Sequence, residues 1–254
     1  MGRVIAIANQ KGGVGKTTTA INLSAALAQK GKKILVIDSD PQGNTTSGFG
    51  IEKNELENTI YELLLGECSI RDAIIKEVFP NLSILPAHVN LAGAEIEMIG
   101  IEKKEYKLKQ EVDWIKDEYD FIIIDCPPSL SMLTVNAMTT ADAVIVPIQC
   151  EFYALEGLSQ LIHTINLVRE RLNRNLAIDG VVFTMFDSRT NLSAQVVENV
   201  KANIKQKVYN TLIPRNVRLA EAPSFGEPIC KYDPRSVGAE KYAELAQEII
   251  EQNA

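Results

Sequence analysis

Residues 9–19 read Asn9-Gln-Lys-Gly-Gly-Val-Gly-Lys-Thr-Thr-Thr19 and follow a short apolar run, Val4 to Ala8. They match the pattern G-x-x-x-x-G-K-[ST] of a phosphate-binding loop, except that Gln10 replaces the first glycine. The apolar run predicts a strand and residues 17–29 predict the helix after it, which is the context that such a loop requires. An ordinary glycine-rich turn with a surface lysine is the alternative. The strand and the helix favour a site for a nucleoside triphosphate.

Each position of the loop has an expected role. The three glycines let successive N–H groups face inward, beside the positive end of the helix dipole. Lys16 is expected to reach the β- and γ-phosphates, and the Thr17 hydroxyl is expected to ligate Mg²⁺. The residues predicted to contact the nucleotide here are Lys11, Gly12, Gly13, Val14, Gly15, Lys16, Thr17 and Thr18.

The composition is that of an ordinary globular chain. Of 254 residues, 46% are hydrophobic and 23% charged, which suffices for a substantial core. No apolar stretch approaches the ~20 residues that span a bilayer, and the first residues lead into a strand without the features of a signal peptide. Four cysteines are scattered without a C-x-x-C pair and are expected to be free thiols of a cytosolic protein.

The charge is unevenly distributed along the chain. The net charge of −7 argues against a uniformly basic nucleic-acid binder. Residues 180–235, however, carry eight Lys and Arg against five Asp and Glu. A local basic face on an acidic protein is therefore compatible with the sequence.

The remaining apolar runs predict an alternation of strands and helices. Further strands are expected at 33–38, 82–85, 121–125, 143–147, 180–184 and 208–213, and helices at 59–65, 70–76, 91–99, 105–116, 155–172 and about 237–252. Segment 39–50 is too rich in turn residues to be expected as an element. The alternation predicts an α/β fold: a single-domain P-loop NTPase, residues 1–254, with a mostly parallel twisted sheet flanked by helices.

Three carboxylates follow predicted strands. Asp125 ends an apolar strand, as the Walker B carboxylate of phosphate-loop enzymes does, and is expected to hold Mg²⁺ directly or through water. Asp38 and Asp40 lie where open α/β sheets place their ligands. We assign Asp40 to orienting the attacking water and Asp38 to the surroundings of the metal, beside the ligands Thr17 and Asp125. A simple cap on the turn at 41–43 is the alternative for Asp40.

Lys11 is a second lysine near the start of the loop. Lys16 already serves the phosphates of its own loop, so Lys11 has no evident role there. Hydrolysis requires positive charge on the γ-phosphate in the transition state, and a partner molecule often supplies it. We therefore expect Lys11 to act in trans, across a dimer with two nucleotides at its interface. The alternative is a solvated lysine.

Together these motifs resemble those of the ParA/Soj chromosome-partition ATPases. The resemblance rests on the deviant Walker A motif at 11–18 and on segments 38–44 and 124–128, and it extends through 149–158, 213–223 and 232–236. It implies an ATP-sandwich homodimer in which Lys11 crosses to the nucleotide of the partner copy. It also implies that Asp40 is required for hydrolysis, and that Pro214 and Asn216 pack on the adenine. The implied catalytic residues are Lys11, Lys16, Asp40 and Asp125.

The same resemblance implies partners and a location. The ATP-bound dimer would bind double-stranded DNA without sequence preference, as contacts to phosphates do. The residues implied are Arg189 and Arg218, with Lys201, Lys205 and Arg235 as additions for which a solvated surface charge is an equal alternative. A ParB-type centromere-binding protein would stimulate hydrolysis, and the protein would be cytoplasmic and nucleoid-associated.

Other functions share parts of this pattern. A MinD-like membrane-associated ATPase that positions cell division is the main alternative, but residues 246–254 are acidic where that family carries a basic membrane helix. An electron-transfer ATPase like the nitrogenase iron protein would need cysteines bridging a cluster between two subunits, and Cys126 and Cys150 lack those surroundings. A scaffold without activity is disfavoured, because Asp40 and Asp125 accompany the loop.

Overall fold

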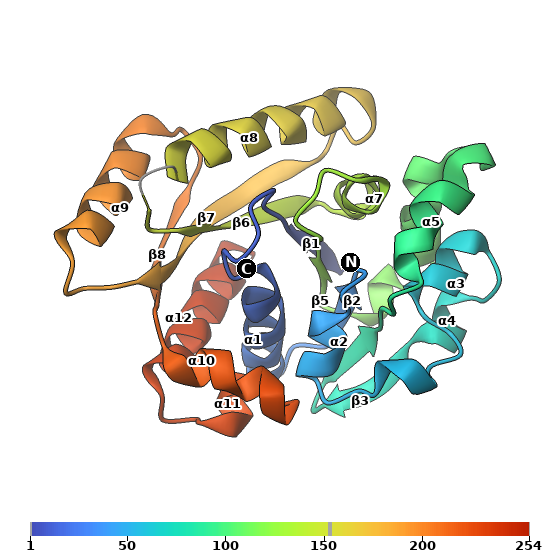
Figure 1. Ribbon diagram of the computed structural model, residues 1–254, viewed down its shortest axis with the longest axis horizontal. Coiled ribbons are helices and arrows are strands. Elements are labelled where there is room, and N and C mark those ends of the chain that lie inside the picture. The colour runs from blue at the N-terminus through green and yellow to red at the C-terminus, as the bar shows by residue number, and fades with distance from the viewer. Residues whose placement is uncertain (1, 152–153, 254) are drawn as a thin grey trace.

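A single sheet of eight strands runs through the computed structural model, which describes residues 2–151 and 154–253 (Figure 1). Its order is β3-β4-β2-β5-β1-β6-β7-β8, and all neighbouring pairs are parallel except β3 with β4. The strands are β1 (Arg3–Ile7), β2 (Ile34–Asp38), β3 (Ile75–Phe79), β4 (Leu82–Leu85), β5 (Phe121–Asp125), β6 (Ala143–Gln149), β7 (Ala177–Phe186) and β8 (Val208–Pro214). The predicted fold class, an α/β fold with a mostly parallel sheet, is confirmed.

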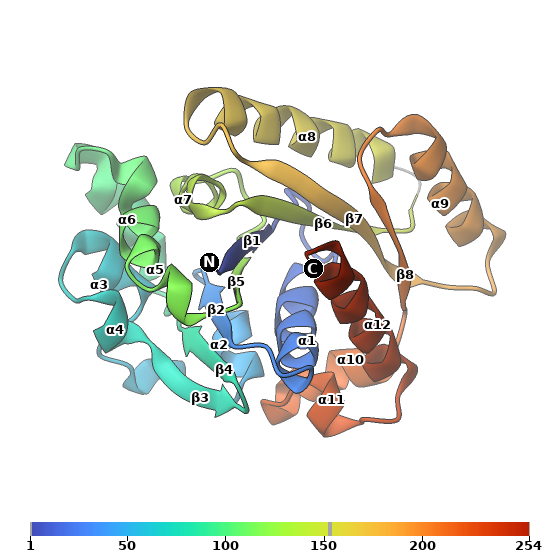
Figure 2. The same cartoon turned by 180° about the vertical axis from the view of Figure 1, so that it is seen from behind.

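Helices cover both faces of this sheet (Figures 1 and 2). One face carries α1 (Lys16–Gln29), α10 (Val217–Glu221), α11 (Ile229–Tyr232) and α12 (Val237–Gln252). The other carries α3 (Ile60–Leu65), α4 (Ile70–Ala73), α5 (Leu91–Glu97), α6 (Lys107–Asp113), α7 (Met132–Thr140), α8 (Ala154–Arg171) and α9 (Asn191–Asn203). A short helix, α2 (Asn44–Gly48), follows β2.

The apolar runs of the sequence become central strands because both of their faces are buried. In β1, Val4 and Ala6 join the core under one helix layer, whereas Ile5 and Ile7 join the core under the other. Side chains alternate across a strand, so a continuous apolar run fills two cores at once. In the described part of the chain, no helix combines the length and the apolar character that crossing a bilayer requires.

Three predicted elements differ in the structure. The helix expected at 70–76 is wrong beyond Ala73, because Ile75–Phe79 forms the antiparallel strand β3 of a hairpin with β4. Asn81 turns the chain in the left-handed region, with φ 63°. The helix expected at 105–116 contains only α6, flanked by single 3₁₀ turns at Lys104–Tyr106 and Lys116–Glu118. Segment 39–50, expected to be irregular, contains α2.

The strand order brings the polar strand ends together. The carboxyl ends of β1, β5 and β2 are adjacent, with Ile7 opposite Asp125 and Asp38 opposite Asp125. Neighbouring strands are about 4.8 Å apart, so the two aspartates lie side by side. The loop at 9–15 leaves β1 at the same edge of the sheet.

Candidate functional site

The loop between β1 and α1 has the backbone of a phosphate cradle. Gly13 and Gly15 have φ of 74° and 87°, in the left-handed region that glycine adopts without strain. Gly15 is the N-cap of α1, and within the described residues this helix start has neither a side-chain cap nor an acidic residue in its first turn. The unpaired N–H groups and the helix dipole there favour an anion.

Two contacts hold the loop in place. The Thr184 hydroxyl, from β7, donates to the carbonyl oxygen of Val14 at 2.7 Å. The Lys16 ammonium donates to the carbonyl oxygen of Lys11 at 2.9 Å, across the loop. Lys16 is only 7% exposed, and its burial lowers the pKa of its ammonium below the usual value. A buried cation at a helix start is suited to an anionic ligand.

A buried group of carboxylates lies beside this helix start. The Asp125 Oδ2 atom accepts hydrogen bonds from the hydroxyls of Thr17, at 2.8 Å, and Thr45, at 2.7 Å. The Asp38 Oδ2 atom accepts from the backbone N–H and the hydroxyl of Thr46, at 2.8 and 2.7 Å.

Asp40 lies at the turn that leads from β2 into α2. Its N–H donates to Asp38 Oδ1 at 3.2 Å, and its own Oδ1 accepts from the N–H of Gln42 at 2.9 Å. The structure therefore shows the turn contact that was the alternative for Asp40, and it also shows that Asp40 adjoins Asp38. Its assignment to the attacking water stays a prediction.

The burial of these acids changes their titration. Burial, followed by the neighbouring Asp38, raises the pKa of Asp125 to about 7. Burial also raises the pKa of Asp38 to about 6, although its bonds to Thr46 oppose the shift. Two carboxylates this close in a dry site cannot both ionise readily without a cation.

The donor set fits Mg²⁺. Asp125 Oδ1 is buried and finds no hydrogen-bond partner among the described residues, so an oxygen is left over for a cation. No group of three or more His, Cys, Asp or Glu side chains able to hold a metal ion occurs in the described residues. Proteins usually bind Mg²⁺ through one or two oxygen ligands together with substrate phosphates and waters. Thr17 and Asp125 are the residues that would hold it, with Asp38 beside them.

Lys11 points away from the interior of its own loop. Its ammonium forms an ion pair with Glu151, which follows β6, and its side chain is 51% exposed. Its backbone N–H donates to the Asn9 side-chain oxygen at 2.9 Å. In this single chain Lys11 is therefore neither on its own phosphate site nor free in solvent. Sequence reasoning missed Glu151, because the pairing joins positions 140 residues apart.

A cavity of about 380 Å³ adjoins the loop. Gly15 and Thr18 line it on one side, and Pro214 and Asn216 line it on the other. Met185, also in the lining, has φ 52°, which is uncommon for a residue with a side chain and recurs at ligand sites. Asn216 Oδ1 accepts from the N–H of Arg218 at 2.8 Å, so this amide is held in place. The cavity has the position that a base attached to phosphates in the loop would need.

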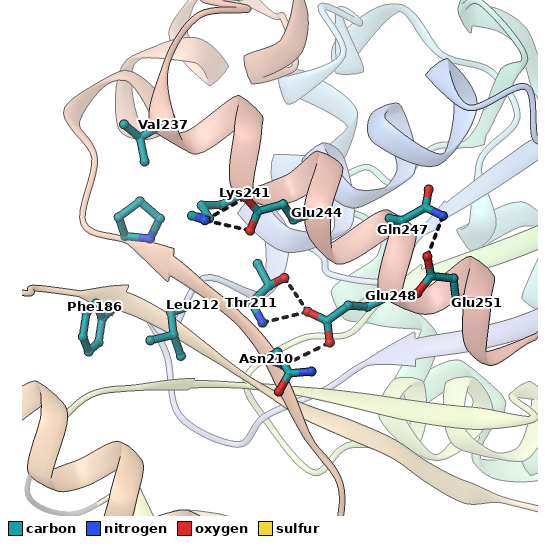
Figure 3. Close-up of a pocket in the computed structure, with 11 residues that line it drawn as sticks. Phe186, Asn210, Thr211, Leu212, Val237, Lys241, Glu244, Gln247, Glu248 and Glu251 are labelled. Atoms are coloured by element: carbon teal, nitrogen blue, oxygen red, sulfur yellow. Dashed lines mark hydrogen bonds and ion pairs between the residues drawn. The ribbon is translucent and has the colours of Figure 1, made fainter.

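A second cavity, of about 570 Å³, lies between β8 and α12 and shares only the lining residue Pro214 with the first (Figure 3). Its three carboxylates all have partners within the chain. Glu244 pairs with Lys241, Glu251 accepts from Gln247, and Glu248 accepts from backbone N–H groups of β8. The Glu248 bonds tie α12 to the edge strand β8, whereas the other two pairs lie within α12. All of these contacts have a structural explanation.

The residues predicted to bind DNA are exposed but dispersed. Arg189 precedes α9 and pairs with Asp187, whereas Arg218, in α10, pairs with Glu221 and Asp233. Lys201 lies in the last turn of α9, about 15 Å along the helix from its first residue, Asn191. Lys205 follows α9, and Arg235 lies between α11 and α12. The set therefore divides between two regions, one in and beside α9 and the other around α10 and the start of α12.

The fold and the loop define an ATPase of the phosphate-loop class, and residues 2–178 match the family model described as an AAA domain. The chain is 56% identical to the sporulation initiation inhibitor protein Soj of Bacillus subtilis, over 98% of each chain. It is 53% identical to the chromosome partitioning protein ParA of Caulobacter vibrioides, over 98% of this chain and 94% of that one.

The solved structure of cobyrinic acid a,c-diamide synthase from Mycobacterium smegmatis with bound ADP and magnesium is also similar. Its TM-score is 0.87 at 37% identity, over 98% of this chain and 94% of that one. The two sequence relatives are close and match nearly end to end. The chain belongs to the ParA/Soj family of chromosome-partitioning ATPases.

Proposed function

We propose that this ATPase is a DNA-partitioning switch. ATP and Mg²⁺ are its cofactors, and ATP binding joins two copies into a nucleotide-sandwich homodimer. The dimer binds DNA without sequence preference, and hydrolysis releases it. The observation that carries the proposal is the position of Lys11: it belongs to the phosphate loop, but its ammonium lies on Glu151 while Lys16 crosses the loop.

The Lys11–Glu151 pair can be exchanged for a stronger contact. Both side chains are partly exposed, at 51% and 32%, and exposed ion pairs stabilise by about 1 kcal/mol or less. A triphosphate in the loop of a second copy carries several charges and attracts an ammonium more strongly than one solvated carboxylate does. Lys11 would therefore leave Glu151 when a second copy presents its nucleotide.

Each site residue has a separate role in hydrolysis. Lys16 and the N–H groups at the start of α1 bind the β- and γ-phosphates, and Lys11 of the second copy adds positive charge there. Asp40 accepts a hydrogen bond from the attacking water and orients it. Mg²⁺, when bound, neutralises charge on the phosphate oxygens, and Thr17 and Asp125 would hold it.

DNA binding follows from joining two weak basic surfaces. Arg189 and Arg218 each have a carboxylate partner on the surface, and exchanging such a solvated partner for a DNA phosphate costs little. One copy presents few dispersed cations, whereas a dimer presents twice as many on one rigid body, which raises the effective concentration of the second set. Nucleoid association in the cytoplasm and stimulation by a ParB-type protein complete the proposal.

The test is DNA binding by the full chain with ATP, with ADP and without nucleotide, at several salt concentrations. We expect tight binding with ATP alone, equal affinity for unrelated duplexes, and a linear fall of log affinity with log salt. Equal binding without nucleotide, or a preference for one sequence, would contradict the proposal.

A further inference from the structure

Thr45 contacts the carboxylate that ends β5, although it lies 80 residues away in the sequence. Its hydroxyl donates to Asp125 Oδ2 at 2.7 Å, and the side chain is fully buried in α2. The same oxygen accepts from Thr17 at 2.8 Å. Two hydroxyls therefore converge on Oδ2, while the buried Oδ1 has no partner among the described residues.

This unequal pairing orients the carboxylate. Rotation of the Asp125 side chain would exchange its two oxygens, and the donors at Oδ2 favour the orientation that leaves Oδ1 open. Thr17, however, is expected to turn its hydroxyl toward Mg²⁺ when the nucleotide binds. Thr45 is then the donor that remains to hold Oδ2.

The backbone around Thr45 is fixed by close packing. A Cβ at Gly48 would lie 2.3 Å from the Ile21 side chain of α1, so α2 is pressed directly against α1. Gly43, the N-cap of α2, has φ 60°, and a Cβ there would lie 2.9 Å from the carbonyl oxygen of Ala87. Thr46 secures the same helix to Asp38. Thr45 thus links the position of α2, the helix that follows Asp40, to the orientation of the Asp125 side chain.

We propose that Thr45 is a positioning residue of the ATPase, which holds Asp125 with its free oxygen available to the metal and links that orientation to the placement of α2. The proposal rests on the role of Asp125 at Mg²⁺. A purely structural role, in which the hydroxyl only satisfies a buried carboxylate, predicts a loss of stability without a change in metal dependence.

Thr45→Val removes the hydroxyl at nearly constant volume, and Thr45→Ser keeps it. Loss of a side chain that orients a metal ligand typically costs 10- to 100-fold in metal affinity or activity. We expect Thr45→Val to raise the Mg²⁺ concentration for half-maximal ATPase at least about tenfold and to lower kcat with a nearly unchanged KM for ATP. Thr45→Ser should restore both.

A second measurement does not depend on turnover. Titration calorimetry of ADP binding, with and without Mg²⁺, reports how much the metal strengthens nucleotide binding. This gain should shrink in Thr45→Val and persist in Thr45→Ser. The matched control is Thr140→Val, which removes another buried hydroxyl, bonded within α7 to the carbonyl oxygen of Asn136, and should leave the gain intact. Thr45→Cys, a weaker donor of similar size, replaces the valine variant if that does not fold.

The outcomes are separable. If Thr45→Val lowers only the melting temperature and keeps the Mg²⁺ dependence, the positioning role is overturned. If Asp125→Asn also keeps the Mg²⁺ gain, the assignment of Asp125 itself fails. Neither result bears on dimerisation or DNA binding, which are measured separately.

Discussion

Replacing Asp125 by asparagine is expected to stabilise the nucleotide-free chain while it removes the response to Mg²⁺. Asp125 is fully buried beside Asp38, and both effects raise its pKa from 3.8 to about 7. The folded chain therefore binds this proton more tightly than the unfolded chain does. The contribution of Asp125 to stability is therefore greatest below pH 4, falls as the pH rises from about 4 to about 7, and stays reduced above that range.

The structure gives the size of the effect. A shift from 3.8 to about 7 corresponds to about 4 kcal/mol of unfolding free energy lost at pH 8. Asparagine avoids this loss, but its NH₂ group then faces the donors Thr17 and Thr45 or lacks an acceptor, which costs about 1–3 kcal/mol. A net gain of about 2 kcal/mol would raise the melting temperature by roughly 4–8 °C in a chain of this length.

The assay is thermal unfolding of both proteins between pH 5 and pH 8, with and without Mg²⁺ and ADP. Asp125→Asn should melt above the original protein at pH 8, and the difference should shrink toward pH 5. Adding Mg²⁺ with ADP should reverse the order, because the original carboxylate then gains its cation. A difference that does not change with pH, or an asparagine variant that is less stable at pH 8 without ligand, would refute the reasoning.

Three further substitutions test separate parts of the account. Asp40→Ala should bind ATP, dimerise and remain on DNA without turnover; an unchanged rate of phosphate release would remove its assignment to the attacking water. Arg189→Glu should weaken DNA binding by a similar factor on all duplexes while leaving the ATPase measured without DNA intact, and a loss confined to some sequences in a gel-shift series would contradict a phosphate contact. Gly180→Ala should cost about 1–3 kcal/mol in urea unfolding, because its Cβ would lie 2.7 Å from the buried ring of Tyr209; an unchanged midpoint would show that this ring can move.

Much of the fold could be predicted from the sequence because its central strands are buried on both faces. In a globular chain, a short and nearly continuous apolar run such as 121–125 is typical of a strand that is buried on both faces. The edge hairpin could not be predicted in the same way. Its strand β3 is half exposed, with a burial pattern that alternates poorly, and Ile70–Lys76 therefore fitted a helical spacing as well as a strand.

The α2 helix could not be predicted from local preference. Its five residues, Asn44–Gly48, are poor helix formers. Tertiary contacts stabilise it instead, namely the hydroxyls of Thr45 and Thr46 on two buried carboxylates and the contact of Gly48 with Ile21. The pattern around Asp38 and Asp40 located the site, but it gave no signal for the threonines that hold it.

The site was predictable where the motif is contiguous and unpredictable where the partners are distant in sequence. The loop at 9–19 could be interpreted because a predicted strand precedes it and a predicted helix follows it. Asp125 followed from the strand that it ends. The pairing of Lys11 with Glu151 joins positions 140 residues apart and depends on side-chain packing that no spacing rule encodes. The pairing of Arg189 with Asp187 is local, because the two residues are only two positions apart. Lys11 and Arg189 would each have to leave these carboxylate partners before Lys11 contacts ATP or Arg189 contacts DNA.

The most direct test of the central claim is sedimentation velocity of the original chain and of Lys11→Ala, each with ATP and with ADP. The account predicts that the original chain sediments as a dimer with ATP and as a monomer with ADP. Lys11→Ala should stay monomeric with both nucleotides while it binds ADP with nearly normal affinity. A Lys11→Ala variant that forms ordinary ATP dimers would contradict the claim that this lysine completes the nucleotide site of a second copy.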